Sequence, residues 1–319
     1  MRAALLTAHG RPPAAGDRDL PAAAASQARV AVTAAPITPL DVLCATGTSY
    51  FGAPALPYVP GVQGVGTLDD GSAVWFPTAA GMRPGDGSMA EHCVVAADSL
   101  VALPEGVDHT LVAALGLSAV AARLALTWRG ELREGEQVLV LGAGGVVGQA
   151  GVQIARMAGA RRVVAACRSA EAQERARRLG ADAVVELRGS DDVDGLAARL
   201  NEACDGPVDL VLDPLFGVPA AAALRTLGPH GRLVNLGGSA GERSPVDSST
   251  LRGRSLRLLG YTNNELTPDQ RAEAIWAVAD DAAAGRLVLD YETVPLAEAG
   301  VAWARQAGGT ATRRIVLVP

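Results

Sequence analysis

A cluster of glycines between an apolar run and a helix-like pattern is the first feature with evident chemistry. The glycines are Gly142, Gly144, Gly145 and Gly148, in "VLVLGAGGVVGQAGVQIA". A strand, a glycine turn and a helix in this order bring backbone amides and the positive end of a helix dipole to a phosphate. The spacing is GxxGxxG over 142, 145 and 148, because a literal GxGxxG has Val147 at its last position. This predicts a dinucleotide site that includes the amides of Val146 and Val147.

The residues after the next apolar run bear on which dinucleotide binds. Cys167, Arg168 and Ser169 stand where an acidic residue would select the ribose hydroxyls of NADH. A guanidinium and a hydroxyl instead suit a 2′-phosphate, so we expect NADPH. The alternative is that Arg168 is an ordinary solvated surface charge. The chain contains no lysine, so any phosphate must be bound by arginine, amides or hydroxyls.

Alternating strand and helix patterns surround the glycine turn from about residue 115 to 261. They predict βαβ units and a parallel sheet of the Rossmann type. Strands are expected at 137–142, 162–167, 182–187, 208–213, 231–238 and 255–262, with helices at 146–159, 170–180, 192–203 and 219–228.

The flanking segments follow a different pattern. Residues 1–114 show short β-branched runs between Pro and Gly clusters, which is typical of a barrel-like β domain. Residues 262–319 hold two helix patterns and two strands, and we expect them to complete that first domain. The predicted fold class is thus α/β, with a Rossmann domain at 115–261 and a second domain from both ends of the chain.

Composition excludes several classes of protein. The chain has 319 residues, a net charge of -6 and no block of like charge, so neither nucleic acid nor an anionic membrane is expected as a partner. We expect no membrane-spanning helix, which would need an apolar run of ~20 residues. The four cysteines lie outside metal-ligand spacing, which suits a reducing compartment, and we expect a cytoplasmic protein.

Several segments, in order, resemble the medium-chain dehydrogenase/reductase superfamily, above all its zinc-independent quinone oxidoreductase and enoyl reductase branch. They include "PLDVLCATG", "LPYVPGVQGVGTL", "GSMAEHCVVAADSLVALPEGV", "AALGLSAVAARLAL", "EGEQVLVLGAGGVVGQAGVQIARMAGA", "VDLVLDPLFG" and "LRTLGPHGRLVNLGG". The resemblance implies a GroES-like β-barrel domain, a Rossmann domain and a nicotinamide between them.

The resemblance also places residues at the cofactor. It implies that Thr38 and Ser118 contact it, where relatives commonly have asparagine and threonine. The segment at the end of the fifth strand should line the nicotinamide pocket, and the end of the fourth strand should close the pocket beside it. The residues concerned are Asn235, Leu236, Gly237, Gly238, Asp213, Pro214 and Phe216.

The resemblance bears on metal binding and on proton donors as well. Zinc-dependent relatives have Cys and His where this chain has Thr38 and Val62, and neither residue can bind the metal, so no metal site is expected. Leu43 replaces an aromatic that is frequent in quinone reductases. Tyr50, one residue from a family tyrosine, and His92, at a usual tyrosine position, are the candidate catalytic residues; the alternatives are a loop tyrosine and a packed histidine.

Three functions remain open. The first is an NADPH-dependent reductase of an activated alkene or a quinone, in which a carbonyl accepts the charge left by hydride addition. The second is a dinucleotide-binding protein that has lost its chemistry, as Leu43 suggests. The third is a tailoring reductase for an imine or a polyketide intermediate. A homodimer is expected through the apolar edge strand at 255–262.

Overall fold

The computed structural model describes residues 1–319, and the chain divides into two compact units. Unit 1 comprises Met1–Gly116 and Pro268–Pro319, and unit 2 comprises Leu117–Thr267. The expected boundary after residue 261 differs from this division. Residues 262–267 belong to unit 2, where the Asn263 side chain donates to the carbonyl oxygen of Leu117 at 3.0 Å.

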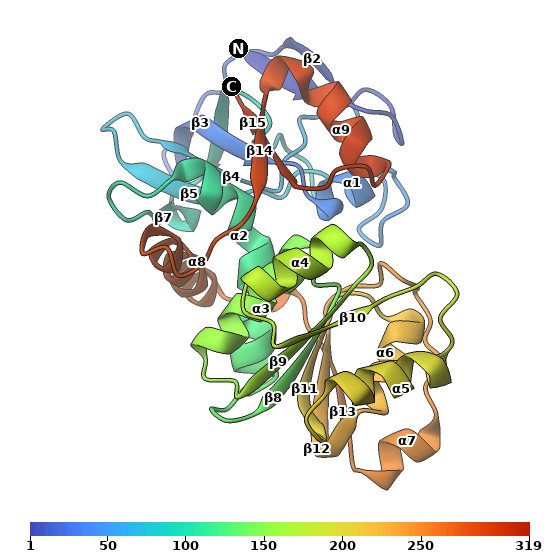
Figure 1. The fold of residues 1–319 in the computed structure, drawn as a ribbon. Coiled ribbons are helices and arrows are strands. Elements are labelled where there is room, and N and C mark those ends of the chain that lie inside the picture. The colour runs from blue at the N-terminus through green and yellow to red at the C-terminus, as the bar shows by residue number, and fades with distance from the viewer. The chain divides into compact units, whose positions relative to one another are not determined.

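Unit 2 is built on a six-stranded parallel sheet in the order β10-β9-β8-β11-β12-β13. Helices α3 and α4 lie on one face of this sheet, and α5 and α6 lie on the other (Figure 1). The strands are β8 (Gln137–Leu141), β9 (Arg162–Cys167), β10 (Ala183–Glu186), β11 (Val208–Asp213), β12 (Leu227–Asn235) and β13 (Arg257–Gly260). The helices are α3 (Val146–Met157), α4 (Ala170–Arg178), α5 (Val193–Ala203), α6 (Gly217–Leu224) and α7 (Ser248–Gly253).

Strands buried on both faces explain why this sheet was predictable. All five residues of β8 are buried, and β9 is buried from Val163 onward. Such strands appear in a sequence as continuous apolar runs. The predicted α/β class with a parallel Rossmann sheet is confirmed.

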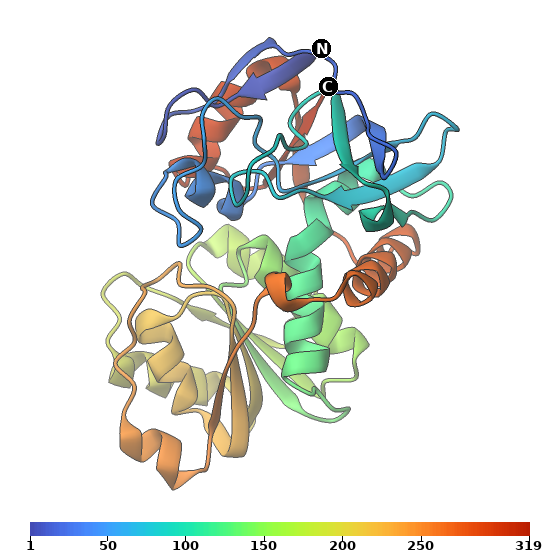
Figure 2. The same ribbon diagram turned by 180° about the vertical axis from the view of Figure 1, so that it is seen from behind.

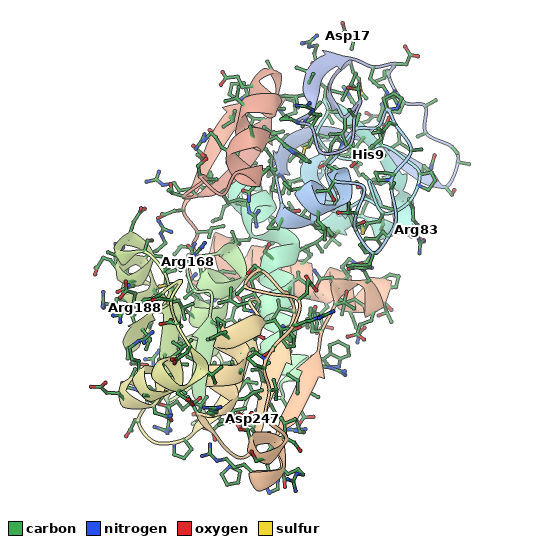
Figure 3. The ribbon with its side chains drawn as sticks, turned by 90° about the vertical axis from the view of Figure 1, so that its right-hand side faces the viewer. His9, Asp17, Arg83, Arg168, Arg188 and Asp247 are labelled. Atoms are coloured by element: carbon green, nitrogen blue, oxygen red, sulfur yellow. The ribbon has the colours of Figure 1, made fainter.

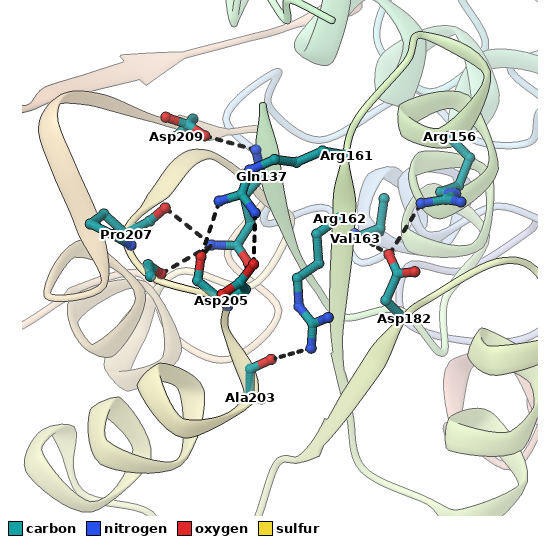
Figure 4. Close-up of polar contacts among 11 residues, drawn as sticks. Gln137, Arg156, Arg161, Arg162, Val163, Asp182, Ala203, Asp205, Pro207 and Asp209 are labelled. Carbon is teal, nitrogen blue, oxygen red and sulfur yellow. Dashed lines mark hydrogen bonds and ion pairs between the residues drawn. The ribbon is translucent and has the colours of Figure 1, made fainter. Parts of the chain in front are cut away.

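Polar side chains tie together the amino ends of the strands (Figure 4). The Gln137 side chain donates to the carbonyl oxygens of Gly206 and Pro207 at 3.0 Å and accepts from the Asp205 amide at 2.9 Å. Asp182 accepts from the Val163 amide at 2.7 Å. This network stabilises the edge opposite the glycine turn. None of its hydrogen bonds involves the turn, which lies at the carboxyl edge.

Unit 1 contains a mixed sheet in the order β14-β15-β3-β4-β5-β7, with β6 paired to β3, and a separate β1-β2 pair. The chain end therefore returns to the first domain, as β14 and β15 join β3 (Figure 2). The strands are β1 (Arg2–Leu5), β2 (Ala14–Asp17), β3 (Gln27–Pro36), β4 (Gln63–Thr67), β5 (Ala73–Pro77), β6 (His92–Ala96), β7 (Val101–Ala102), β14 (Tyr291–Pro295) and β15 (Arg314–Val318). The helices are α1 (Pro39–Ala45), α8 (Pro268–Ala283) and α9 (Ala299–Ala307).

Helix α2 (His109–Leu124) runs across the boundary and is interrupted at Gly116, whose φ of 34° and ψ of -134° are not helical. The positive φ of Gly116 is one that residues with side chains rarely adopt, and a Cβ there would also displace the end of the Gln63 side chain, so glycine is favoured at this position. The segment His109–Arg129 is 21 residues long, and the mean hydropathy of its most apolar 18-residue window is 1.7. By length and composition alone it could cross a membrane, but 61% of that window is buried within the protein.

Candidate functional site

The glycine turn has the geometry of an anion cradle. Gly142 has φ +64°, a conformation that favours glycine, and turns the chain out of β8. Gly145 is the N-cap of α3, with no side-chain cap and no acidic residue in the first turn. The first-turn amides, which include those of Val146, Val147 and Gly148, have no partner within the helix, so they are available to a phosphate.

The four glycines of the turn serve different purposes. A Cβ at Gly148 would lie 2.4 Å from the Gly142 carbonyl oxygen, and one at Gly144 would lie 3.1 Å from Ala172 Cβ. A Cβ at Gly145 would meet only the Gly142 oxygen, at 3.6 Å. The protein itself therefore does not need glycine at 145. The missing side chain leaves open space in front of the helix, which fits a pyrophosphate that must approach the backbone.

The end of β9 presents one unpaired cation. Cys167 is buried, whereas Arg168 is exposed and its guanidinium has no partner in the protein. Ser169 caps α4 by accepting from the Ala172 amide at 3.2 Å, which leaves its hydroxyl proton to donate elsewhere. Figure 3 shows Arg168 and Arg188 on the same side of unit 2, but Arg188 is bound to Glu186 at 2.8 Å.

Strand order divides the dinucleotide site into two halves. The chain passes from β8 to β9 on one side and reaches β11 on the other, so the order reverses between β8 and β11. Dinucleotides bind across such a switch point, at the carboxyl ends of the strands. An adenosine half on the β9 side puts the nicotinamide half over β11 and β12, which carry the expected segments 213–216 and 235–238.

Asp213 and Asn235 are paired at the carboxyl ends of β11 and β12. Asp213 Oδ1 accepts from the amides of Leu215 and Phe216 at 2.9 and 2.8 Å, and Oδ2 accepts from Asn235 Nδ2 at 2.9 Å. Burial raises the pKa of Asp213, and these hydrogen bonds limit the rise. This fully buried carboxylate is thus occupied in holding the segment in shape.

The segment after Asp213 packs against the glycine turn. A Cβ at Gly142 would lie 3.0 Å from Leu215 and 3.2 Å from Pro214, and a Cβ at Gly237 would lie 2.8 Å from the Pro214 oxygen. Phe216 has φ +57° and ψ -153°, a conformation that non-glycine residues rarely adopt. The Leu236 amide donates to the Asp213 carbonyl oxygen at 2.9 Å. In unit 2 the structure therefore brings the expected residues of the turn, β11 and β12 together along one edge.

In unit 1, Thr38 is bound to a carboxylate that the sequence analysis missed. The Thr38 hydroxyl donates to Asp41 Oδ2 at 2.6 Å, and Asp41 Oδ1 accepts from the amides of Gly61 and Val62 at 3.1 and 2.9 Å. The signal was present in "TPLD", a capping box with proline in the first turn. Because the Thr38 hydroxyl gives its single proton to Asp41, it has none left to donate to a cofactor. The Thr38 side chain is also buried.

Arg314 supports this arrangement from the C-terminal strand. Its Nη1 donates to the Ile37 carbonyl oxygen at 2.8 Å. Burial raises the pKa of Asp41, and the bonds from Thr38 and Val62 and the charge of Arg314 oppose the rise. Burial lowers the pKa of Arg314 to about 10. The two charges together fix the segments that carry Thr38 and Val62.

The two candidate catalytic residues lie in different surroundings. Tyr50 is 78% exposed, with its ring centroid 4.1 Å from that of Phe51. His92 pairs with Ala31 on β3, seven residues before Thr38, or roughly 20 Å along an extended strand. It lines a pocket of about 390 Å³ and its Nδ1 has no partner. His92 and Thr38 therefore do not share a site.

Zinc does not fit the residues present. Thr38 and Val62 carry no ligand for it, and the structure has no group of three or more His, Cys, Asp or Glu side chains able to hold a metal. Cys44, Cys93 and Cys167 are buried free thiols whose pKa is raised mainly by burial.

Comparison with known proteins agrees with this geometry. A family model described as "Zinc-binding dehydrogenase" matches residues 146–279. The quinone oxidoreductase of Sus scrofa is 29% identical over 263 residues, which cover 79% of this chain and 77% of that protein. A solved quinone oxidoreductase from Thermus thermophilus, described together with its NADPH complex, has a TM-score of 0.82 and 29% identity, with all of both chains covered.

A much longer protein is also similar. A phenolphthiocerol/phthiocerol polyketide synthase of Mycobacterium tuberculosis is 30% identical over 312 residues, covering 91% of this chain. The chain spans 13% of the length of that synthase polypeptide. The fold is that of a solved quinone oxidoreductase that is described together with its NADPH complex. The chain belongs to the medium-chain dehydrogenase/reductase superfamily, in its quinone oxidoreductase-like branch.

Proposed function

We propose that the chain is a zinc-independent, NADPH-dependent reductase of an activated alkene, such as an enone or enoyl thioester, or of a quinone. The observation that carries the proposal is the open cradle at Gly145, at the switch point of a sheet shared with quinone oxidoreductases. Arg168, exposed and unpaired at the end of β9, supports NADPH over NADH. The Thermus relative is described in complex with NADPH.

A reduced nicotinamide supplies a hydride, so the substrate must hold the resulting charge on an oxygen. The absence of zinc ligands at Thr38 and Val62 favours substrates whose own conjugated carbonyl stabilises that charge. The Thr38 hydroxyl donates its proton to Asp41, so toward a ligand its oxygen can only accept a hydrogen bond. Tyr50, whose hydroxyl is exposed, remains our proposed donor to the substrate oxygen, and Ser118 remains a proposed cofactor contact.

The test is NADPH oxidation, followed by its absorbance, with a benzoquinone, a small enone and a crotonyl thioester, and with a saturated aldehyde as control. We expect turnover with at least one conjugated acceptor and none with the aldehyde. Chelator should not reduce the rate, and elemental analysis should find no stoichiometric zinc. One zinc per chain together with loss of activity in chelator would contradict zinc independence.

A second candidate follows from the polyketide synthase relative, which covers 91% of this chain. It is a tailoring reductase acting on a polyketide-type thioester. A kcat/KM that is higher for a pantetheine thioester of an α,β-unsaturated acid than for any quinone would favour it. NADPH binding without turnover on any acceptor would instead support a binding protein that has lost its chemistry, which the exposed Leu43 keeps open.

We also propose a cytoplasmic homodimer joined at β13, with a small-molecule substrate and neither nucleic acid nor a membrane as partner. The support is the position of β13 at the end of the sheet and the exposure of Leu258, of which 42% is accessible.

A further inference from the structure

The side-chain amide of Asn235 is held in one orientation. Its nitrogen donates to the Gly237 carbonyl oxygen at 2.8 Å, to Asp213 Oδ2 at 2.9 Å and to the Asp213 carbonyl oxygen at 3.2 Å. The two carbonyl oxygens have no proton to give, whatever the charge of the carboxyl group. A flipped amide would face its oxygen toward three acceptors, so the network itself assigns the nitrogen.

Asp213 cannot readily turn away from Asn235. Its side chain is fully buried, and its other oxygen holds the amides of Leu215 and Phe216 at 2.9 and 2.8 Å. The register sets Asp213 directly beside Asn235 on the neighbouring parallel strand. The carboxylate therefore acts as a fixed point for the amide.

The consequence is an oriented acceptor at the carboxyl edge of the sheet. With its nitrogen bound on the inside, Asn235 directs Oδ1 away from the Asp213 and Gly237 oxygens. This oxygen has no hydrogen-bond partner in the protein, and Asn235 is half-buried, so solvent reaches it. The other polar side-chain atoms of Asp213 and Asn235 are all hydrogen-bonded within the protein. Asn235 Oδ1 is therefore the one that can bind a ligand.

Topology places this oxygen on the nicotinamide side of the turn. β12 is two strands from β8, or roughly 10 Å at the usual strand spacing, on the side away from Arg168. The donors on that half of a dinucleotide are the carboxamide N–H group of the nicotinamide and the ribose hydroxyls. The carboxamide lies at the far end of this half, as Asn235 lies beyond β11.

We propose that Asn235 Oδ1 accepts a hydrogen bond from the carboxamide N–H group of the nicotinamide, and that Asp213 is the positioning residue that fixes its orientation. The inference rests on the proposed function, since it needs a nicotinamide dinucleotide at this edge. It adds a contact that distinguishes the carboxamide from other substituents on the ring.

The experiment compares dissociation constants of NADP⁺ and 3-acetylpyridine adenine dinucleotide phosphate, in which a methyl group replaces the amide nitrogen. Titration calorimetry is done on the wild type and on Asn235→Ala, Asp213→Asn and Ser239→Ala. We expect the wild type to prefer NADP⁺ by roughly 3- to 10-fold, the range of one neutral hydrogen bond. Asn235→Ala should bring the ratio close to one. Asp213→Asn should reduce the ratio, because its amide would face that of Asn235.

Ser239→Ala is the matched control, since it removes only a 3.1 Å bond to the Pro214 oxygen on the same segment and should keep the wild-type ratio. An unchanged ratio in Asn235→Ala would overturn the inference while leaving NADPH binding intact. A wild-type ratio near one, with both nucleotides weakened by Asn235→Ala, would assign the oxygen to a ribose hydroxyl and also overturn it. Failure of the wild type to bind either nucleotide would overturn the proposed function instead.

Discussion

Gly148 lies so close to Gly142 that a Cβ at position 148 would be 2.4 Å from the Gly142 carbonyl oxygen, whereas one at Gly145 would be 3.6 Å from the same atom. The two glycines of this motif are therefore needed for different reasons. Position 148 is fixed by packing within the fold. At position 145 the protein itself leaves room for a side chain. The glycine there is explained by a phosphate that must approach the backbone.

Matched alanine substitutions separate these roles. Gly145→Ala should change the free energy of unfolding by less than about 0.5 kcal/mol but weaken NADPH and NADH alike by about 10-fold or more. Gly148→Ala should destabilise the fold by about 1–3 kcal/mol through overpacking. Urea unfolding and nucleotide titration measure both effects. Unaltered nucleotide binding by a folded Gly145→Ala would show that no phosphate approaches this glycine.

The sequence predicted the strands of unit 2 that are buried on both faces. It misplaced the ends of a helix where contacts made by side chains determine them. The helix expected at 219–228 begins at Gly217, because Asp213 caps the segment before it, and ends at Leu224. Leu227, assigned to that helix, instead begins β12 and pairs with Val208. Local propensity favoured helix here, and the tertiary pairing overrode it.

The site in unit 1 was harder to predict for a different reason. Thr38 was identified by resemblance, but the hydrogen bonding of its hydroxyl is set by Asp41. Asp41 is in turn held by the amides of Gly61 and Val62 and by the charge of Arg314. The bond from Arg314 to Ile37 joins residues 277 positions apart. No local spacing reveals that contact, whereas the pairing of Thr38 with Asp41 is local and could have been predicted from the capping box in "TPLD".

Arg168 provides the test of cofactor choice. Its exposed guanidinium has no protein partner, so Arg168→Ala should leave stability unchanged. Loss of a charge-assisted contact of roughly 1.5–3 kcal/mol should weaken NADPH about 10- to 150-fold and leave NADH unaffected. Salt should also weaken NADPH binding more in the wild type than in the variant.

The control for Arg168 is Arg188→Ala, on the same side of unit 2 but already paired with Glu186. It should keep the preference for NADPH over NADH. If Arg168→Ala also keeps that preference, Arg168 is a solvated surface charge and the assignment of NADPH loses its main support.

The exposed edge of β13 predicts the assembly. Leu258→Arg places a charge on the apolar edge and should convert the expected dimer to a monomer, as measured by light scattering at micromolar concentration. Val301→Arg, at an apolar position on α9 that is 67% exposed, should remain dimeric. A wild type that is monomeric at the same concentration would contradict a dimer through this strand.

The ion pair between Glu136 and Arg232 predicts how stability depends on pH. Arg232 donates to both oxygens of Glu136, at 2.8 and 2.7 Å, with only 18% of the Glu136 side chain and 7% of the Arg232 side chain exposed. Burial alone would raise the pKa of Glu136, but the bonds from Arg232 and the Arg133 amide and the charges of both arginines outweigh burial and lower it.

A carboxylate whose pKa is lowered by folding stabilises the protein above its unfolded pKa of 4.5 and loses that contribution as the pH falls through the lower, folded value. Glu136→Gln should therefore cost about 2 kcal/mol at pH 7, and its deficit relative to the wild type should shrink as the pH falls below about 4.5. Urea unfolding of both proteins from neutral pH down to about pH 3.5 measures the deficit, with exposed Glu134→Gln as control. A deficit that stays constant or grows on acidification would show that the charge of Glu136 is not what stabilises this edge of the sheet.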